Sequence, residues 1–263
     1  MANRILTLIY GLMSYAMFLA VSLYMLGFIG DFLTPTRLDG PREGTLIESL
    51  MIDFGLLALF ALQHSVMARP RFKQWWTKFV PERIERSTYV VFSSLALFAV
   101  VLLWQPLGGT IWRIENPAGQ VAAYVLFAIG WLTVLMSTYL INHFDLFGLR
   151  QVWLYFRGRP YTSLRFATPG PYRWVRHPLY IGWMITFWAT PTMTAGHLFF
   201  AALLTIYMVG AAMLEERDLI AHFGSRYEEY RRQVPMFIPR LPMGSRQADP
   251  AKQAPATAIA EAQ

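Results

Sequence analysis

Residues 5–29 read ILTLIYGLMSYAMFLAVSLYMLGFI, a run without a charged side chain. About 20 apolar residues are enough for a helix to cross the roughly 30 Å of hydrocarbon in a bilayer. The run exceeds the apolar region of a signal peptide, about 7 to 15 residues, and no convincing small-residue cleavage site follows it. We therefore expect a retained membrane-spanning helix here.

Five further apolar segments predict that the whole chain is embedded in a membrane. Hydrophobic residues make up 55% of the chain and charged residues 15%, which is outside the average for soluble proteins. The segments cover approximately 46–68, 87–107, 121–141, 178–194 and 197–214. The segment 178–194 is short and contains a proline near its end, so it is either a span or the half-buried arm of a helical hairpin. The predicted fold is an all-α, polytopic membrane bundle with five or six spans.

The basic residues assign a side to each loop. If the amino terminus lies inside, the inner segments hold 20 of the 23 Lys and Arg residues, and the outer loops hold only Arg37, Arg42 and Arg113. Cytoplasmic loops of membrane proteins carry an excess of positive charge. We expect six crossings of the cytoplasmic (inner) membrane with both termini and the active site on the cytoplasmic side. A five-crossing alternative would place one terminus on the wrong side, and nucleic-acid binding is not needed to explain the net charge of +7.

One integral membrane domain is expected over residues 1–242, with a cofactor-binding half at about 168–242. Residues 243–263 are rich in Ala, Pro and Gln without periodicity, which predicts a disordered tail. The chain has no cysteine, so disulfides and thiolate metal centres are excluded, and we expect no metal site.

Titratable residues from four distant segments are predicted to lie at one membrane depth. Ionisable groups at this depth are costly and are candidates for function. Helix ends also carry polar residues for structural reasons, so for any single histidine the two interpretations are about equally good, but the convergence favours a common site. The residues concerned are His64, His143, Asp145, His177, Glu215 and Glu216, whereas His197 and His222 have no obvious company.

An amphipathic helix is predicted after the last span. In EERDLIAHFGSRYEEYRRQVP, residues 215–235, an apolar face alternates with a charged face at helical spacing. Gly224 could divide this segment into two short helices. We expect it to lie near the bilayer on the cytoplasmic side and to fold over the polar cluster.

The carboxyl-terminal half carries two motifs in order. RHPLYIG, Arg176 to Gly182, is followed by the pair Glu215 and Glu216 and by FGSRYEEYRRQVPMFIP, residues 223–239. These motifs resemble the isoprenylcysteine carboxyl methyltransferases and phospholipid methyltransferases. The resemblance implies a helical hairpin and an acidic pair that bind S-adenosyl-L-methionine.

A second resemblance extends from the second span to Pro239. QHSVMARP (63–70), ERSTYV (85–90) and STYLINHFDLFGLRQVW (137–153) are similar to the methanethiol S-methyltransferase family, within the wider NnrU-like membrane proteins. This resemblance implies transfer of a methyl group from S-adenosylmethionine to a small volatile thiol, methanethiol, which gives dimethyl sulfide.

A sulfonium cofactor needs anionic and aromatic partners and hydrogen bonds to its ribose. The acidic pair supplies charge, the tyrosines supply rings and hydroxyls, and Gly182 lets a ligand or another helix approach the backbone. For Tyr230 we expect amphipathic packing alone. The residues expected at the cofactor are Arg176, His177, Tyr180, Gly182, Glu215, Glu216 and Tyr227.

Methylation of a thiol requires loss of its proton. For a thiol with a pKa of about 8.5, formation of the thiolate at pH 7 costs about 2 kcal/mol, so a general base accelerates the reaction. His143 and His64 are the candidate bases, and Asp145 or Asn142 could orient the imidazole of His143.

Two alternatives remain open at this stage. The first is methylation of a lipid amine or of an isoprenylcysteine carboxylate, which needs a lateral opening towards the bilayer. The second is a non-catalytic NnrU-type membrane protein, which would either support nitrogen-oxide metabolism or bind haem through two histidines. The sequence does not indicate an oligomeric state, nor does it rank Glu215 against Glu216.

Overall fold

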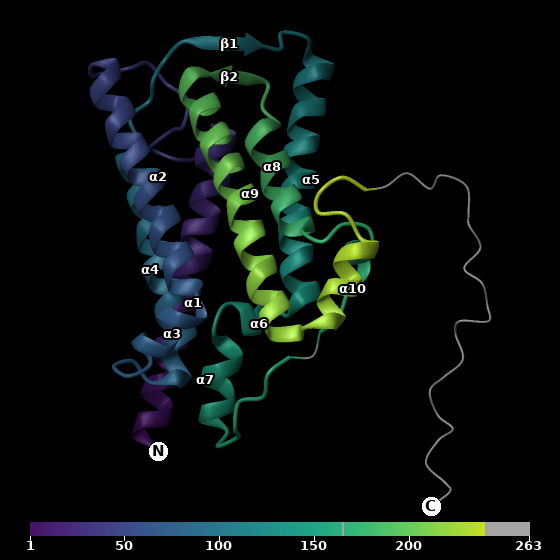
Figure 1. Cartoon of the computed structure of the whole chain (residues 1–263). Coiled ribbons are helices and arrows are strands. Elements are labelled where there is room, and N and C mark those ends of the chain that lie inside the picture. Colours follow the sequence, from purple (N-terminus) through teal and green to yellow (C-terminus); the bar gives the residue numbers. More distant parts are fainter. Residues whose placement is uncertain (165, 240–263) are drawn as a thin grey trace, which may run out of the picture.

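The structure is a computed structural model that describes residues 1–164 and 166–239, so the expected tail at 243–263 lies outside the described residues. Five of its helices are long and apolar enough to cross a membrane, which confirms the all-α, polytopic class (Figure 1). Their bounds are α1 Ala2–Gly30, α2 Leu46–Ala68, α4 Glu82–Leu103, α5 Pro117–Ile141 and α9 Ala195–Phe223.

The predicted segment 178–194 crosses the bundle in a different way. Helix α8, Pro178–Trp188, has only 11 residues and rises about 16 Å. An extended stretch then leads to strand β2, Thr192–Thr194, which pairs antiparallel with β1, Thr110–Arg113. Because β1 precedes α5 and β2 precedes α9, the two strands mark one end of the bundle, which we name the ribbon end (Figure 1). The chain thus passes six times between the two ends, and the helical prediction beyond Trp188 was wrong because Pro191 cannot continue a helix.

Helices α5 and α8 pack at very short range. A Cβ atom added to Gly182 would lie 2.8 Å from the backbone nitrogen of Val134, and one added to Gly130 would lie 2.8 Å from that of Thr186. The two glycines therefore let the helix backbones touch, as small residues do between membrane helices. This contact holds the short helix α8 in place without a long apolar surface of its own.

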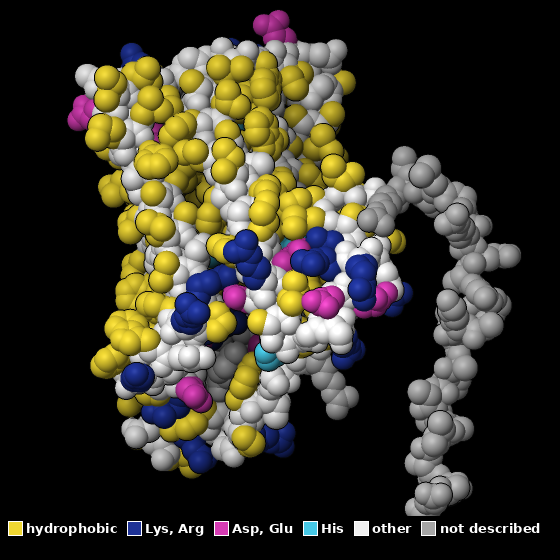
Figure 2. All heavy atoms as spheres, in the orientation of Figure 1, with side chains coloured by type: hydrophobic (Ala, Val, Ile, Leu, Met, Phe, Trp, Pro, Cys, Tyr) yellow, Lys and Arg dark blue, Asp and Glu magenta, His cyan; other side chains and the backbone are white. Residues whose placement is uncertain are grey.

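Short helices gather at the opposite end of the bundle, together with the amino terminus (Figure 1). We name this the basic end, because lysine and arginine side chains collect towards it while apolar side chains cover much of the bundle flank (Figure 2). Its elements are α3 Pro70–Trp76, α6 His143–Leu146, α7 Leu149–Phe156, the 3-10 helix η1 Gly170–Arg173 and α10 Ser225–Gln233.

The break predicted at Gly224 is present. This residue has a φ of 58°, which favours glycine, and it separates α9 from α10. The segment before the break is not a separate short helix, however, since α9 continues through it to Phe223.

The buried apolar core lies mainly in the half of the bundle nearer the ribbon end. Val21 and Phe28 of α1 pack there with residues of α4 and α9, among them Val101, Trp104 and Phe200. The polar side chains of the candidate site lie towards the basic end. The half of the bundle near the ribbon end therefore supplies the packed core, and the half near the basic end holds the candidate functional residues.

Candidate active site

Arg176 and His177 meet Glu216 at the start of α8. The Nε of Arg176 donates a hydrogen bond of 2.6 Å to Glu216 Oε1, and the Nε2 of His177 donates one of 3.1 Å to the same oxygen. All three side chains are at least nine-tenths buried. Both partners of this carboxylate are thus fixed, and the group holds α8 against α9.

The chain after α10 crosses the same motif. The backbone N–H groups of Arg176 and His177 donate to the carbonyl oxygens of Pro235 and Met236 at 2.9 and 3.2 Å. The guanidinium of Arg176 also donates to the carbonyl oxygen of Val234. The amphipathic segment therefore folds over the polar cluster, as expected, through main-chain bonds that residue types alone do not reveal.

Tyr227 and Tyr230 both face the interior from α10. Tyr227 is 2% exposed, and burial is the main reason that its pKa is raised, so the phenol is neutral. The Tyr230 hydroxyl donates a hydrogen bond of 2.6 Å to the carbonyl oxygen of Tyr172. Tyr230 thus anchors α10 to η1 by a hydrogen bond, which goes beyond the packing role expected for it.

Glu215 has quite different surroundings from its neighbour. Its side chain is 44% exposed, and Tyr180 donates a hydrogen bond of 2.8 Å to its Oε2. The ring of Tyr180 lies parallel to that of His177, with centroids 5.2 Å apart. A charged carboxylate that remains accessible beside an aromatic ring suits a cationic ligand.

The direction of Glu215 follows from its place on α9. Tyr207, Ala211, Glu215 and Asp218 follow one another at helical spacing, so they share a face. On this face Tyr207 hydrogen-bonds Ser65 of α2 at 3.1 Å. Asp218 forms an ion pair of 2.8 Å with Arg69, just after α2. Glu215 lies between these two contacts, so its carboxylate faces the space between α2, α8 and α9.

His64 lies on α2 next to this space. The hydroxyl of Tyr89 is 3.0 Å from both ring nitrogens, and Ser93 Oγ is 3.2 Å from Nδ1. One hydroxyl cannot bond well to two nitrogens of the same ring, so His64 is not fixed in one tautomer. Its ring also contacts that of Phe60, with centroids 5.2 Å apart.

His143 is held by hydrogen bonds to two side chains. Thr138 Oγ1 donates to the carbonyl oxygen of Leu135, so it accepts from His143 Nδ1 at 2.9 Å. The hydroxyl of Tyr15 then donates to His143 Nε2 at 2.7 Å. The imidazole is neutral in this arrangement, and burial lowers its pKa accordingly. A haem iron or a substrate proton would have to displace Tyr15 to reach that nitrogen.

The expected pairing of Asp145 with His143 is corrected by the structure. Among the described residues Asp145 binds Arg150 at 2.9 Å, and Tyr161 donates to its Oδ2 at 3.3 Å. The side chain of Asn142 accepts from the backbone N–H of Asp145, so it caps α6 instead of orienting the imidazole. Both residues lie in the short helix α6, two positions apart, so their side chains point about 200° away from each other around the helix axis.

Two further expectations change. Gly182 faces the backbone of α5, so its missing side chain serves helix packing and not the approach of a cofactor. His197 does have polar partners, because its Nδ1 lies 3.0 Å from Asp39 Oδ2 and its Nε2 lies 2.9 Å from the carbonyl oxygen of Phe187. Asp39 and the carbonyl group of Phe187 thus hold both nitrogens of this buried ring.

Residues that the sequence did not single out complete the site. Ser65, Arg69, Tyr89, Tyr207 and Asp218 join α2, α4 and α9 around His64 and Glu215. Ser65, Arg69 and Tyr89 lie within the motifs QHSVMARP and ERSTYV, so the sequence pointed to the segments that contain them. Tyr207 lies in no such motif, and the sequence did not distinguish it from other aromatic residues of a membrane helix. The described residues hold no group of three or more His, Asp or Glu side chains placed to bind a metal ion.

Comparisons with known proteins identify the relatives of this chain. A family model described as phospholipid methyltransferase matches residues 118–226. The chain is 56% identical to the methanethiol S-methyltransferase of Crocosphaera subtropica, over 90% of this chain and 93% of that protein. It is 50% identical to the methanethiol S-methyltransferase of Mycobacterium tuberculosis, over 90% and 97%, and 33% identical to human nurim, over 68% and 71%. No solved structure matches.

A multi-pass helical bundle with this hairpin and these relatives is a membrane-embedded methyltransferase. Within that class, the chain belongs to the methanethiol S-methyltransferase family.

Proposed function

We propose that the protein transfers a methyl group from S-adenosyl-L-methionine to methanethiol and so forms dimethyl sulfide. The relatives named methanethiol S-methyltransferase support the acceptor. The observation that carries the proposal is the division of the acidic pair: Glu216 is buried between Arg176 and His177, whereas Glu215 is accessible next to Tyr180.

The residues present fit a methyl-bearing sulfonium cofactor, which supplies an electrophilic methyl group when it is bound. Glu215 provides the carboxylate for its positive charge, and Tyr180 provides an aromatic face. Arg176, His177 and Glu216 act as positioning residues, because they fix the turn from which Tyr180 projects. Tyr227 is buried near Arg176 and Glu216 and helps to exclude water from them.

His64 is the better candidate for the group that takes the thiol proton. It adjoins the space that Glu215 faces, and its ring is not committed to fixed partners as that of His143 is. Tyr89 shares a hydrogen bond with the ring and thus steadies it after it gains a proton. Loss of this base would leave the thiolate to form unaided, at a cost of about 2 kcal/mol at pH 7.

The basic end is proposed to face the cytoplasm. Lysine and arginine collect there, and positive charge is retained on the cytoplasmic side during insertion (Figure 2). The site would then open to the compartment in which the cofactor is made. One integral domain over residues 1–242, with the cofactor-binding half at 168–242, remains the proposed organisation.

The test is a headspace assay of purified protein in detergent with methanethiol and S-adenosylmethionine. We expect equal amounts of dimethyl sulfide and S-adenosylhomocysteine, and no methylated product with phosphatidylethanolamine in place of the thiol. Folded protein that forms neither product would contradict the proposal. His64→Gln should lower kcat by about 30-fold or more, and His143→Gln by much less, since the lost base is worth about 2 kcal/mol. The reverse order would assign the proton to His143.

A further inference from the structure

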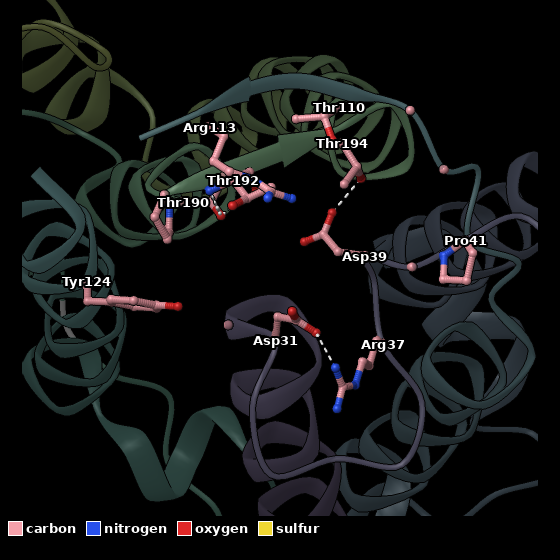
Figure 3. A pocket seen from close by; sticks show the side chains of 15 residues that line it. Asp31, Arg37, Asp39, Pro41, Thr110, Arg113, Tyr124, Thr190, Thr192 and Thr194 are labelled. Carbon is pink, nitrogen blue, oxygen red and sulfur yellow. Dashed lines mark hydrogen bonds and ion pairs between the residues drawn. The ribbon is translucent and has the colours of Figure 1, made fainter. Parts of the chain in front are cut away.

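A polar cavity of about 430 Å³ lies at the ribbon end, far from the proposed active site. The end of α1, the loop after it, α5 and both strands line it, and Figure 3 shows the carboxylates of Asp31 and Asp39 and the hydroxyl of Tyr124 directed towards the same space. Arg37 and Arg113 also line it, and they are two of the three basic residues of the outer loops. The cavity thus offers both signs of charge.

Asp31 is the side chain most in need of a cationic partner. Its carboxylate is 3.7 Å from the guanidinium of Arg37, beyond hydrogen-bond length, and both side chains are substantially exposed. It sits in the left-handed backbone region, with a φ of 57°, at the carboxyl end of α1, where the helix dipole disfavours negative charge. Asp39, by contrast, already has two partners, the hydroxyl of Thr194 and the ring of His197.

An apolar groove of about 430 Å³ begins beside this cavity. Ala20, Leu23, Tyr24 and Gly27 form its wall on one face of α1, and Phe32 and Leu33 close its outer end. From Gly27 to Ala20 the wall descends about 10 Å from the ribbon end into the bilayer. A polar cavity at the membrane surface and an apolar groove that leads inward from it match an amphipathic ligand.

The segment between the two hollows is held in place. The backbone N–H of Phe32 donates to the carbonyl oxygen of Gly27 at 3.0 Å. The hydroxyls of Tyr24 and Thr36 lie 2.7 Å apart, and Thr36 also donates to the carbonyl oxygen of Val101 on α4 at 2.5 Å. The loop after α1 is therefore fastened to two helices, so both hollows exist before a ligand arrives.

We propose that the ribbon end binds one molecule of a zwitterionic phospholipid of the phosphatidylethanolamine type. Asp31 accepts the primary ammonium, and the guanidinium groups of Arg113 and Arg37 bind the phosphate. One acyl chain lies along the groove of α1. The lipid is not a substrate here, because this cavity lies at the ribbon end, whereas Glu215 and His64 lie near the opposite ends of α9 and α2.

The experiment is native mass spectrometry of the purified full chain, titrated in detergent with phosphatidylethanolamine or phosphatidylglycerol. We expect phosphatidylethanolamine to be retained preferentially, since phosphatidylglycerol has the phosphate but no ammonium. Asp31→Asn should lower its retention about tenfold, while Glu43→Gln, an acidic residue of the same loop that does not line the cavity, should leave it unchanged. Leu23→Asn in the groove should also weaken retention of the lipid.

Three results would overturn the proposal. The first is equal retention of phosphatidylethanolamine by the wild type, Asp31→Asn and Leu23→Asn. The second is equal retention of the two lipids by the wild type. The third is displacement of the lipid by free phosphoethanolamine at equal concentration, which would show that the headgroup alone is the ligand. If Asp31→Asn does not elute as a folded species in size-exclusion chromatography, Arg113→Gln replaces it and should weaken retention of both lipids.

Discussion

The hydroxyl of Tyr180 donates a hydrogen bond of 2.8 Å to Glu215, whereas the adjacent Glu216 accepts its hydrogen bonds from Arg176 and His177. Consecutive residues of a helix point about 100° apart. One carboxylate of the tandem pair therefore lies on the face of α9 that is turned towards α2, and the other faces the buried start of α8. This division predicts separate effects for substitutions at neighbouring positions.

Glu216→Gln should destabilise the fold, whereas Glu215→Gln should weaken cofactor binding. Glu216 is buried against Arg176, and removal of one partner of a buried ion pair costs about 3 kcal/mol. Glu215 has a half-exposed side chain, so its loss should barely move the unfolding midpoint. Thermal unfolding in detergent and calorimetry with S-adenosylmethionine measure the two effects. Equal cofactor affinity in Glu215→Gln and the wild type would remove Glu215 from the site.

Tyr180→Phe tests the hydrogen bond to Glu215 without loss of the ring that stacks on His177. We expect cofactor affinity to fall by about tenfold, the usual worth of a hydrogen bond to a charged group. Tyr10→Phe is the matched control, because its hydroxyl bonds Thr88 far from the acidic pair. A weakening of similar size in both variants would indicate a general effect of hydroxyl loss and contradict the assignment.

The stability of the protein should decrease as the pH is lowered, in part because of His143. Its folded pKa is lowered by burial, while in the unfolded chain the group titrates near 6.5. Below this pH the unfolded state binds a proton that the folded state does not, so stability present above about 6.5 is lost as the pH falls towards the folded pKa. The drop in unfolding midpoint between pH 7.5 and pH 5.5 should be smaller in His143→Gln, since all other titrating groups are shared. An equal drop would show that His143 does not contribute.

Phe60 is expected to limit the size of the thiol. Its ring lies 5.2 Å from that of His64 and 6.2 Å from that of Tyr207, so three rings from two helices bound the space beside the proposed base. One methylene is worth about 1–3 kcal/mol in an apolar pocket, so Phe60→Ala should raise the ratio of ethanethiol to methanethiol turnover at least fivefold. Phe54→Ala on the exposed face of α2 is the control and should leave the ratio unchanged. An unchanged ratio in Phe60→Ala would place the thiol elsewhere.

The sequence by itself determined the membrane class, the positions of the five long apolar helices and the collection of basic residues at one end. These follow from the transfer free energies of single residues and from their positions along the chain, so neighbours in space are not needed to predict them. It also predicted which titratable residues lie near one depth, because the ends of spans lie at known depths. The extent of α8 was the exception, since its extended half reads as apolar as a helix does.

Only the tertiary structure decided which partners these groups have. The contacts Tyr180 to Glu215, Tyr15 to His143 and Asp39 to His197 join residues 35, 128 and 158 positions apart. Such contacts depend on how each helix is rotated and on how closely its neighbours approach, as at Gly182 on α5. Composition and spacing leave that rotation undetermined for helices that are apolar on every side. The choice between two adjacent glutamates and between two histidines of the same predicted depth is therefore a property of the packed bundle.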